Sequence, residues 1–304
     1  MPYFSAVTQT IHLIVNPAAG GGRARRKREQ AIAALGALGP LEVRESAAAR
    51  DETRLAIEAA ESNARALVVL GGDGSVSHAA RGLIAAKSQV PLAIFAAGTG
   101  NDFAKSLGIP AHDYAAMAQM IGASRVRTID AGEIDGVPFV NAAGLGFDVA
   151  VLQRMQDPRA GSWLQGTPRY VITAVQSLLG YPGFDAAVSA LANGAQQRWL
   201  TIVFANGRWF GGAFQIAPHA RLDNGLLETV AIADATPVGR AALFARALRG
   251  AHLSRPEVKT ASSAAVTLVC PDAPHFEVDG ELHHAQRATV LVRCLPGALR
   301  VIAG

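Results

Sequence analysis

Short apolar runs alternate with helix-like patterns over the first 130 residues. The runs are too short for helices and several are β-branched, which is typical of buried strands. The expected strands are residues 11–15, 41–44, 66–70 and 92–95. The expected helices are residues 23–38, 51–62 and 76–87, followed by a short one that ends before Gly108 and Pro110. This alternation predicts a parallel sheet with crossover helices, in which ligands bind at the carboxyl ends of the strands.

The pattern changes after about Arg127, where alternating and apolar runs are separated by turn signals. These signals are Asp135-Gly136, Asn193-Gly194 and Pro296-Gly297. Each predicts a hairpin or tight turn. Helices are few in this half. One is expected around residues 168–179, and one begins at Thr236-Pro237, where the threonine caps the helix and the proline takes its first position.

Length and composition are those of a folded, two-domain protein. We expect an α/β domain over residues 1–129 and an antiparallel β-sandwich over residues 130–304. Half of the residues are hydrophobic and only 17% are charged, which excludes intrinsic disorder. No apolar stretch reaches the ~20 residues of a membrane-spanning helix, and no signal peptide is expected. Cys270 and Cys294 form no CxxC pattern, which predicts buried thiols in a cytoplasmic protein.

The net charge of +4 favours anionic partners such as nucleotides and acidic membranes. Five basic residues cluster directly after a glycine-rich stretch: Arg23, Arg25, Arg26, Lys27 and Arg28. Nucleic-acid binding would require aromatic side chains among them for base stacking, and none is present. We therefore expect no nucleic-acid partner. The cluster suits a nucleotide or an anionic membrane surface, and it equally suits an ordinary solvated helix face.

The strongest local motif is Gly71-Gly72-Asp73-Gly74-Ser75, which follows an expected buried strand. Glycines let the backbone approach a phosphate closely, and turn amides ahead of a helix bind anions. Asp73 would repel phosphate unless a cation lies between them, so it indicates Mg²⁺ or a proton relay. The alternative is a plain strand-to-helix turn in which Asp73 caps the helix.

Two further loops follow expected strands. The first, residues 16–22 (NPAAGGG), offers glycine amides but lacks the Gly-Lys-[Ser/Thr] ending of a Walker A loop and the GxGxxG spacing of a dinucleotide site. The second, residues 98–102 (GTGND), supplies the Thr99 hydroxyl and the Asn101 amide for phosphate and ribose contacts. Asp102 is equally suited to cap the next helix.

The second half contains two acidic turns. Asp223-Asn224-Gly225 is either a plain turn or an oxygen-rich loop for a hard cation. Val278-Asp279-Gly280-Glu281 is either a solvated hairpin or the carrier of a general base, Glu281. His283 and His284 are neighbours, so on a strand they point to opposite faces and do not share a metal.

The ordered set of NPxxGGG, GGDG[ST], GTxND, a PxAxxDDG-like loop and DGE resembles the diacylglycerol kinase catalytic-domain superfamily. Within it, the chain is similar to soluble bacterial lipid kinases of the YegS and DgkB type. Residues 141–148 (NAAGLGFD) and 206–212 (NGRWFGG) also match the pattern of the family's second domain. The resemblance covers essentially the whole chain. It implies an N-terminal nucleotide domain related to phosphofructokinases and NAD kinases, a C-terminal β-sandwich, and ATP in the cleft between them.

The resemblance also implies roles for individual residues. Glu281 would accept the proton of the lipid hydroxyl, and Asp73 would lie close to the phosphates. Ligands of a magnesium ion would be Arg221, Asp223, Asn224 and Leu226, the first and last through their carbonyls. ATP contacts would be Asn16, Pro17, Ala18, Ala19, Gly20, Ser46, Gly71, Gly72, Asp73, Gly74, Ser75, Val76, Ser77 and Thr99.

Three features depart from the family pattern. Ser75 stands in place of a threonine and keeps the hydroxyl, and Ala96-Ala97 stand where a proline and a leucine are common. Asn224 replaces the second aspartate of the DDG pattern, and this loss of a negative ligand weakens the expected magnesium site.

The predicted activity is transfer of phosphate from Mg·ATP to a lipid hydroxyl, with a diacylglycerol-like substrate and peripheral contact with the inner face of the membrane. Two alternatives stay open at this point. One is a kinase of a soluble hydroxyl compound such as NAD, and the other is a nucleotide-binding regulator without catalysis. The sequence leaves the particular lipid and the oligomeric state open.

Overall fold

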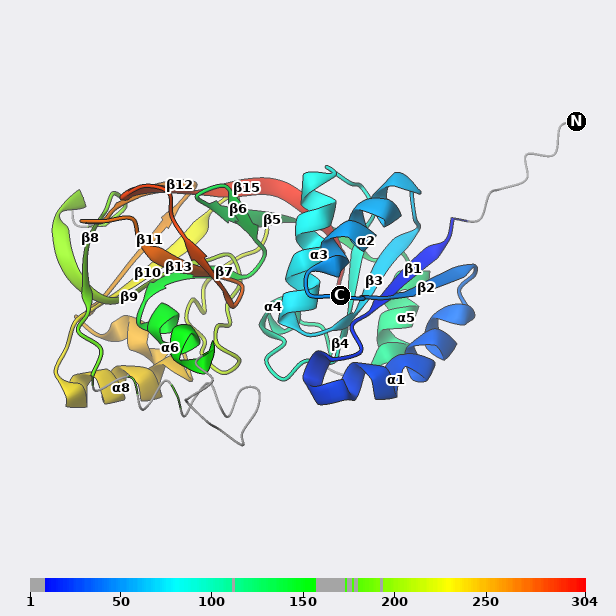
Figure 1. Cartoon of the computed structure of the whole chain (residues 1–304), viewed down its shortest axis with the longest axis horizontal. Coiled ribbons are helices and arrows are strands. Elements are labelled where there is room, and N and C mark those ends of the chain that lie inside the picture. Colours follow the sequence, from blue (N-terminus) through cyan, green and yellow to red (C-terminus); the bar gives the residue numbers. More distant parts are fainter. Residues whose placement is uncertain (1–8, 111–112, 157–172, 174–176, 178–179, 192–193) are drawn as a thin grey trace, which may run out of the picture. The chain divides into compact units, whose positions relative to one another are not determined.

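The computed structural model describes residues 9–110, 113–156, 173, 177, 180–191 and 194–304. The chain divides into two compact units, both drawn in Figure 1. The first unit comprises residues up to 98, 107–128 and 299–304, and the second comprises residues 99–106 and 129–298. Most of the helix expected at residues 168–179 lies outside the described residues.

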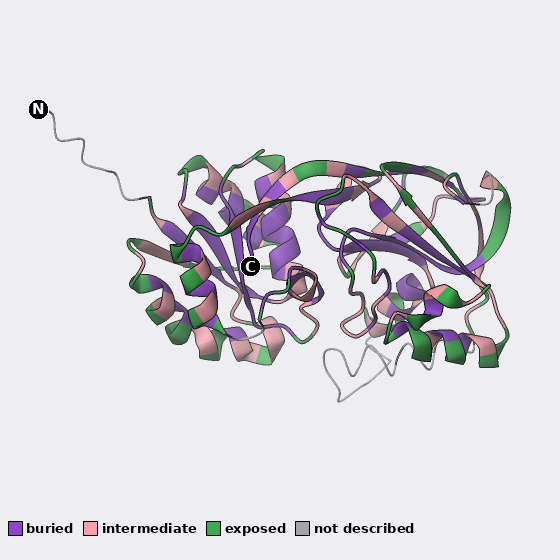
Figure 2. Cartoon of the chain, turned by 180° about the vertical axis from the view of Figure 1, so that it is seen from behind, coloured by how far each residue is buried: buried purple, intermediate pink, exposed green. Residues whose placement is uncertain are grey.

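The first unit is built on a parallel sheet. Its strands are β1 (Ile11–Val15), β2 (Leu41–Glu45), β3 (Ala66–Gly71) and β4 (Leu92–Ala96). Their order is β4-β3-β1-β2, and neighbouring strands are parallel. Every residue of β1, β3 and β4 is buried, as Figure 2 shows. Strands covered on both faces are continuously apolar, which is why these runs were recognisable in the sequence.

Helices cover both faces of this sheet. They are α1 (Ala19–Gly36), α2 (Asp51–Glu61), α3 (Asp73–Ala85) and α5 (Tyr114–Gly122). The α2 helix packs on α3 and the α1 helix on α5, and Figure 1 shows the two pairs on opposite faces. The α3 helix begins earlier than the sequence predicts, because it includes Asp73. Within the bounds of α1, Gly20, Gly21 and Gly22 have non-helical φ and ψ angles, so the regular helix begins after them, as predicted.

The expected turn at Pro296-Gly297 is wrong, because both residues lie inside the strand β15 (Thr289–Ile302). Gly297 has a φ of 62°, and its N–H donates to Asp130 Oδ1 at 2.8 Å. The Asp130 carboxylate therefore accepts the N–H of Gly297, whose backbone departs from regular strand geometry, and the strand continues past it. Val301 then pairs in parallel with Leu92, so the end of β15 belongs to the sheet of the first unit.

The second unit is antiparallel. Its remaining strands are β5 (Val126–Ile134), β6 (Val137–Phe139), β7 (Ala142–Gly146), β8 (Phe184–Val188), β9 (Gln196–Ala205), β10 (Leu227–Ala233), β11 (Val258–Ser263), β12 (Ala265–Val269), β13 (His275–Val278) and β14 (Glu281–His284). The strand order is β14-β13-β7-β9-β8-β12-β15. Off this path, β10 pairs with β9 and β11, and β5 pairs with β15 and β6. The predicted fold class, a parallel α/β region followed by an antiparallel β region, is confirmed.

Two apolar clusters support this unit. One gathers around Trp199, Phe204 and Phe276, and the other lies where the sheet meets Phe147 and Leu243. The helices are α4 (Asp102–Ser106), α6 (Phe147–Gln156), α8 (Pro237–Ala247) and the 3₁₀ helix η2 (Ala251–Ser254). As predicted, the Thr236 hydroxyl caps α8 by accepting the Gly239 N–H. Cys270 and Cys294 are buried free thiols, as expected, and burial raises the pKa of each to about 11.

Candidate active site

The three predicted glycine loops follow β1, β3 and β4, which are adjacent parallel strands and therefore end at one edge of the sheet. Backbone hydrogen bonds join the loops. The Asn16 N–H donates to the Leu70 carbonyl at 3.1 Å, and the Ala97 N–H donates to the Gly71 carbonyl at 2.8 Å. A Cβ on Gly72 would lie 3.2 Å from Gly98 Cα. These contacts build the loops into one backbone surface.

The first loop is shaped by glycine. Gly20, Gly21 and Gly22 have φ values of 61°, 65° and 81°, which only glycine adopts readily. A side chain on Gly20 would also collide with the Ala97 carbonyl. Arg23 Nη1 donates to the Gly98 carbonyl at 2.9 Å, so the first residue of the basic cluster joins two of the loops. Positive-φ residues followed by a helix expose backbone N–H groups that suit an anion.

A buried carboxylate ties the first two loops together. Glu52, on α2, is only 1% exposed. The Asn16 amide donates to Glu52 Oε1 at 3.0 Å and to the Ser75 hydroxyl at 2.9 Å, and His78 Nδ1 lies 3.6 Å from Glu52 Oε2. Burial alone would raise the pKa of Glu52, but hydrogen bonds from His78, the backbone and Ser75 lower it overall. Sequence reasoning missed Glu52, because its DETR context reads as an ordinary helix start.

Replacing Glu52 by Ala is expected to destabilise the protein at neutral pH, by about 1–3 kcal/mol for each buried polar partner left unsatisfied. A lowered pKa contributes stability above the ordinary value of 4.5, and this stability is lost as the pH falls through the folded-state value. The difference between the variant and the unmodified protein should therefore shrink on acidification. Urea unfolding at pH 7 and pH 4 measures this. Glu61→Ala, an exposed change on the same helix, is the control, and equal losses in both variants would contradict the role of Glu52.

The other residues predicted to contact nucleotide differ in how exposed they are to solvent. Val76 and Ser77 are buried at 3% and 2% exposure, so their side chains belong to the core of the first unit. Ser46 follows β2, and its N–H donates to the Val15 carbonyl at 2.9 Å. Asp73 and Gly74, in the first turn of α3, are partly exposed. Thr99 is exposed and begins the segment that groups with the second unit.

Asp102 does not cap α4. Its carboxylate accepts the Gly212 N–H at 2.6 Å and the Lys105 ammonium at 3.1 Å. The segment 99–106 is thereby anchored to a distant loop of the second unit. The sequence predicted neither this anchoring role of Asp102 nor Gly212 as its partner, because the two residues are more than one hundred positions apart.

Glu281 begins β14, directly after the Asp279-Gly280 turn. Asp279 holds this turn in place: its carboxylate accepts the N–H groups of Val140 and Asn141 at 3.0 Å and of Ala142 at 3.1 Å. The turn is thus bound to the backbone that leads into β7. Asp279 and Gly280 have φ values of 49° and 89°, as expected for a two-residue hairpin. The sequence predicted the hairpin but not the clamp made by Asp279.

The predicted opposite orientation of the two histidines after Glu281 is confirmed. His283 stacks on Phe276 with ring centroids 5.4 Å apart, whereas His284 faces His275 at 4.4 Å. Within the described residues, no group of three or more His, Cys, Asp or Glu side chains is arranged to hold a metal.

The predicted magnesium loop is held by internal bonds. The Asn224 side-chain oxygen accepts the Leu226 N–H at 3.1 Å, and Arg221 Nε lies 3.6 Å from Asp223 Oδ1. The Gly225 N–H donates to Asp130 Oδ2 at 2.6 Å. Asp223 is the single carboxylate of the loop and a guanidinium stands beside it, so these donors do not fit a resident Mg²⁺ as they are arranged. The magnesium role of Arg221, Asp223, Asn224 and Leu226 stays a prediction.

Both halves of the chain are similar to known protein families. Residues 10–134 match the model of the diacylglycerol kinase catalytic domain, and residues 141–303 match that of the YegS C-terminal NAD kinase beta sandwich-like domain. A diacylglycerol kinase of Mycobacterium tuberculosis is 31% identical over 299 residues, covering 95% of this chain and 93% of that protein. The chain belongs to the diacylglycerol kinase family. The resemblance seen in the motifs is therefore confirmed.

More distant relatives agree with this assignment. A diacylglycerol kinase of Bacillus subtilis is 24% identical over 233 residues, covering 77% of this chain and 76% of the relative. The crystal structure of a diacylglycerol kinase from Bacillus anthracis matches with a TM-score of 0.74 at 21% identity, covering 97% of both chains, which supports the fold. Proteins of this family are lipid kinases. Among the described helices of this family member, none combines the length and apolar character needed to cross a membrane.

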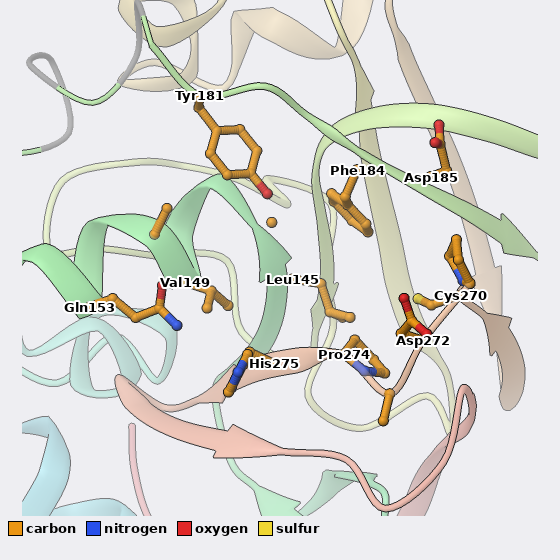
Figure 3. A pocket seen from close by; sticks show the side chains of 14 residues that line it. Leu145, Val149, Gln153, Tyr181, Phe184, Asp185, Cys270, Asp272, Pro274 and His275 are labelled. Carbon is orange, nitrogen blue, oxygen red and sulfur yellow. The ribbon is translucent and has the colours of Figure 1, made fainter.

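The hollows of the second unit of this kinase family member include a small cavity and a larger pocket. A small cavity of about 70 Å³ is walled by α6, β9 and α8, with Phe147, Leu200 and Phe244 among its apolar residues. A larger pocket of about 340 Å³ lies between α6, Tyr181, Phe184 and His275, as Figure 3 shows. None of the predicted site residues lines the larger pocket.

Proposed function

We propose that the protein transfers the γ-phosphoryl group of Mg·ATP to the hydroxyl of a diacylglycerol-like lipid. The observation that carries this proposal is the gathering of three glycine loops at one edge of the parallel sheet, in a chain whose family phosphorylates lipids. Phosphoryl transfer asks a protein mainly for positioning and charge neutralisation.

The first unit would bind the nucleotide. The backbone N–H groups of Gly20 and Gly21 and of the first turn of α3 would hold phosphate oxygens, with help from the dipole of the 13-residue α3 helix. Magnesium arrives with ATP as part of the substrate, and the Asp73 carboxylate would face that cation. Asn16 and Ser75 would shape the loops, since their side chains are held in the Glu52 network.

The second unit would bind the lipid and remove its proton. Glu281 would act as the general base for the acceptor hydroxyl, from the turn that Asp279 fixes. The apolar cavity beside α8 offers the kind of wall that a hydrocarbon chain needs. These features favour a lipid over a soluble alcohol.

Peripheral membrane contact would involve the outer face of α8. Exposed residues of α8 and of the turn that follows it include Val238, at 81% exposure, together with Arg246, Leu248 and Arg249. The sequence contains no acidic residue between Ala235 and Pro256. In contrast, the outer faces of α1 and α2 contain ion pairs such as Arg28–Glu29 and Arg54–Glu58. A face with arginines, exposed apolar side chains and no acid suits an anionic lipid surface.

A labelled-ATP transfer assay tests the proposal, with diacylglycerol, phosphatidylglycerol, sphingoid bases and NAD as acceptors and the product identified by mass. We expect phosphorylation of a lipid, faster from vesicles that contain anionic lipid than from neutral vesicles. Transfer to NAD alone would replace the proposal by a soluble-substrate kinase. ATP binding without transfer to any acceptor in ample Mg²⁺ would indicate a regulator without catalysis.

A further inference from the structure

Two buried carboxylates meet behind the turn that precedes Glu281. Asp148 lies in the first turn of α6, and Glu277 lies on β13, where it is the register partner of Gly144 on β7. Their exposures are 3% and 1%. A Cβ on Gly144 would collide with Asp148 Oδ2 and would lie 3.1 Å from Glu277 Oε1. The missing side chain of Gly144 therefore leaves the space that both carboxyl groups approach.

The outer oxygens of this pair have clear partners. Asp148 Oδ1 accepts the Thr201 hydroxyl at 2.8 Å. Glu277 Oε2 accepts the N–H of Gly280, inside the turn, at 2.7 Å. Asp148 Oδ2 is buried and has no hydrogen-bond partner within the described residues. Two carboxylates that face each other in a buried place repel when both are ionised, whereas one proton between them makes a strong O–H···O⁻ hydrogen bond.

We propose that protonated Asp148 donates a hydrogen bond to Glu277, and that both are positioning residues for the turn that precedes Glu281. The inference rests on the proposed function for the role of Glu281. The proton path is short: Asp148 Oδ2–H donates to Glu277 Oε1, and Glu277 Oε2 accepts the Gly280 N–H. This chain of bonds adds to the clamp that Asp279 makes on the other side of the turn.

The environment of Asp148 favours the proton. Burial raises the pKa of Asp148 to about 6, against the opposing hydrogen bonds from Thr201 and from the backbone of residues 148 and 149. Tyr181 packs edge-on against Phe147 of α6, and Arg240 of α8 lines the same cavity as Asp148 while binding Asp234. On the hairpin itself, the titratable groups nearest to Glu277 in the chain are His275, Asp279, Glu281 and His283.

The shared proton makes the stability of the protein depend on pH. A folded-state pKa raised from 3.8 to about 6 gives stability that is full below 3.8 and is lost as the pH rises through about 6. Above that pH the two carboxylates repel, and the turn that precedes Glu281 becomes less well fixed. We therefore expect the melting temperature and kcat to decline together between pH 5 and pH 8.

The test compares Asp148→Asn, Glu277→Gln and the control Asp272→Asn, an exposed carboxyl near the start of β13. The amide that Asp148→Asn introduces can donate permanently to Glu277, so this variant should melt several degrees higher than the unmodified protein at pH 8 and equally at pH 5. Glu277→Gln should behave alike, because its amide can donate to Asp148. The control should keep the normal pH profile. An unchanged profile in both pair variants, or lower melting at both pH values, would overturn the shared proton.

The second measurement is kcat against pH, together with KM for ATP. If the pair positions the turn, the decline in kcat with pH should be roughly tenfold smaller in Glu277→Gln, while KM for ATP stays the same. The melting temperature could depend on pH as predicted while kcat does not. That result would show that the pair shares a proton but does not position the turn. Melting needs no substrate, so failure of the lipid kinase proposal would leave the shared-proton result standing.

Discussion

The Glu281→Gln variant should lose kcat by about 10²–10⁴-fold, the usual contribution of a general base. The glutamine is nearly the same size and keeps an oxygen acceptor, but it cannot take a proton from the lipid hydroxyl at neutral pH. In the proposed function, ATP binds to the loops of the first unit, which lie in a separate part of the chain. The dissociation constant for ATP should therefore stay within about twofold, because the change leaves that unit untouched.

Calorimetry for ATP binding and initial rates on vesicles measure the two quantities separately. Asp272→Asn is the matched control, since it also removes one carboxylate from the same part of the second unit. A Glu281→Gln enzyme with full kcat would show that another group accepts the proton. Equal loss of kcat and of ATP affinity would point to a folding defect, which a melting curve at the assay pH detects.

The Asp279→Ala variant should be among the least stable single substitutions in the second unit. Its carboxylate satisfies three backbone N–H groups, on Val140, Asn141 and Ala142, and all three residues are buried. Leaving them without an acceptor costs about 3–9 kcal/mol in total, given about 1–3 kcal/mol for each buried unsatisfied group. Alanine also tolerates the positive φ of 49° less well than aspartate or asparagine.

Urea unfolding at pH 7 measures the loss, and Asp279→Asn separates its two causes. Asparagine keeps the left-handed backbone and one acceptor oxygen, so it should recover a substantial part of the stability. Asp272→Ala, an exposed aspartate nearby in the chain, sets the baseline. A loss of less than about 1 kcal/mol in Asp279→Ala would contradict the clamp, because even one buried N–H without an acceptor costs that much.

The sequence predicted best where the signal is local. The buried strands near residues 11–15, 66–70 and 92–95 were recognisable because strands covered on both faces must be continuously apolar. The Asp279-Gly280 hairpin followed from its turn residues in the same way. Family motifs then supplied the candidate residues, and the structure brings the three loops of the first unit together.

What the sequence could not predict are contacts between distant residues. Glu52 looks like any acidic residue at a helix start. Its structural role depends on Asn16 and Ser75, which the fold brings beside it. Pro296-Gly297 reads as a turn, yet Asp130 accepts the glycine N–H and the strand continues. The acid pair of Asp148 and Glu277 depends on the absent side chain of Gly144, across two strands. Such pairings follow from topology, which residue types do not encode locally.

The path of β15 constrains the order in which the chain can fold during synthesis. Leu299, Val301 and Ile302 are almost fully buried in the first unit, and Val301 pairs with Leu92. A ribosome translates these residues about two hundred positions after β4. The edge of β4 in the amino-terminal sheet therefore stays unpaired until the end of β15 has been synthesised. Nascent chains halted before Leu299 should therefore depend on chaperones or aggregate, even though most of that unit has already emerged.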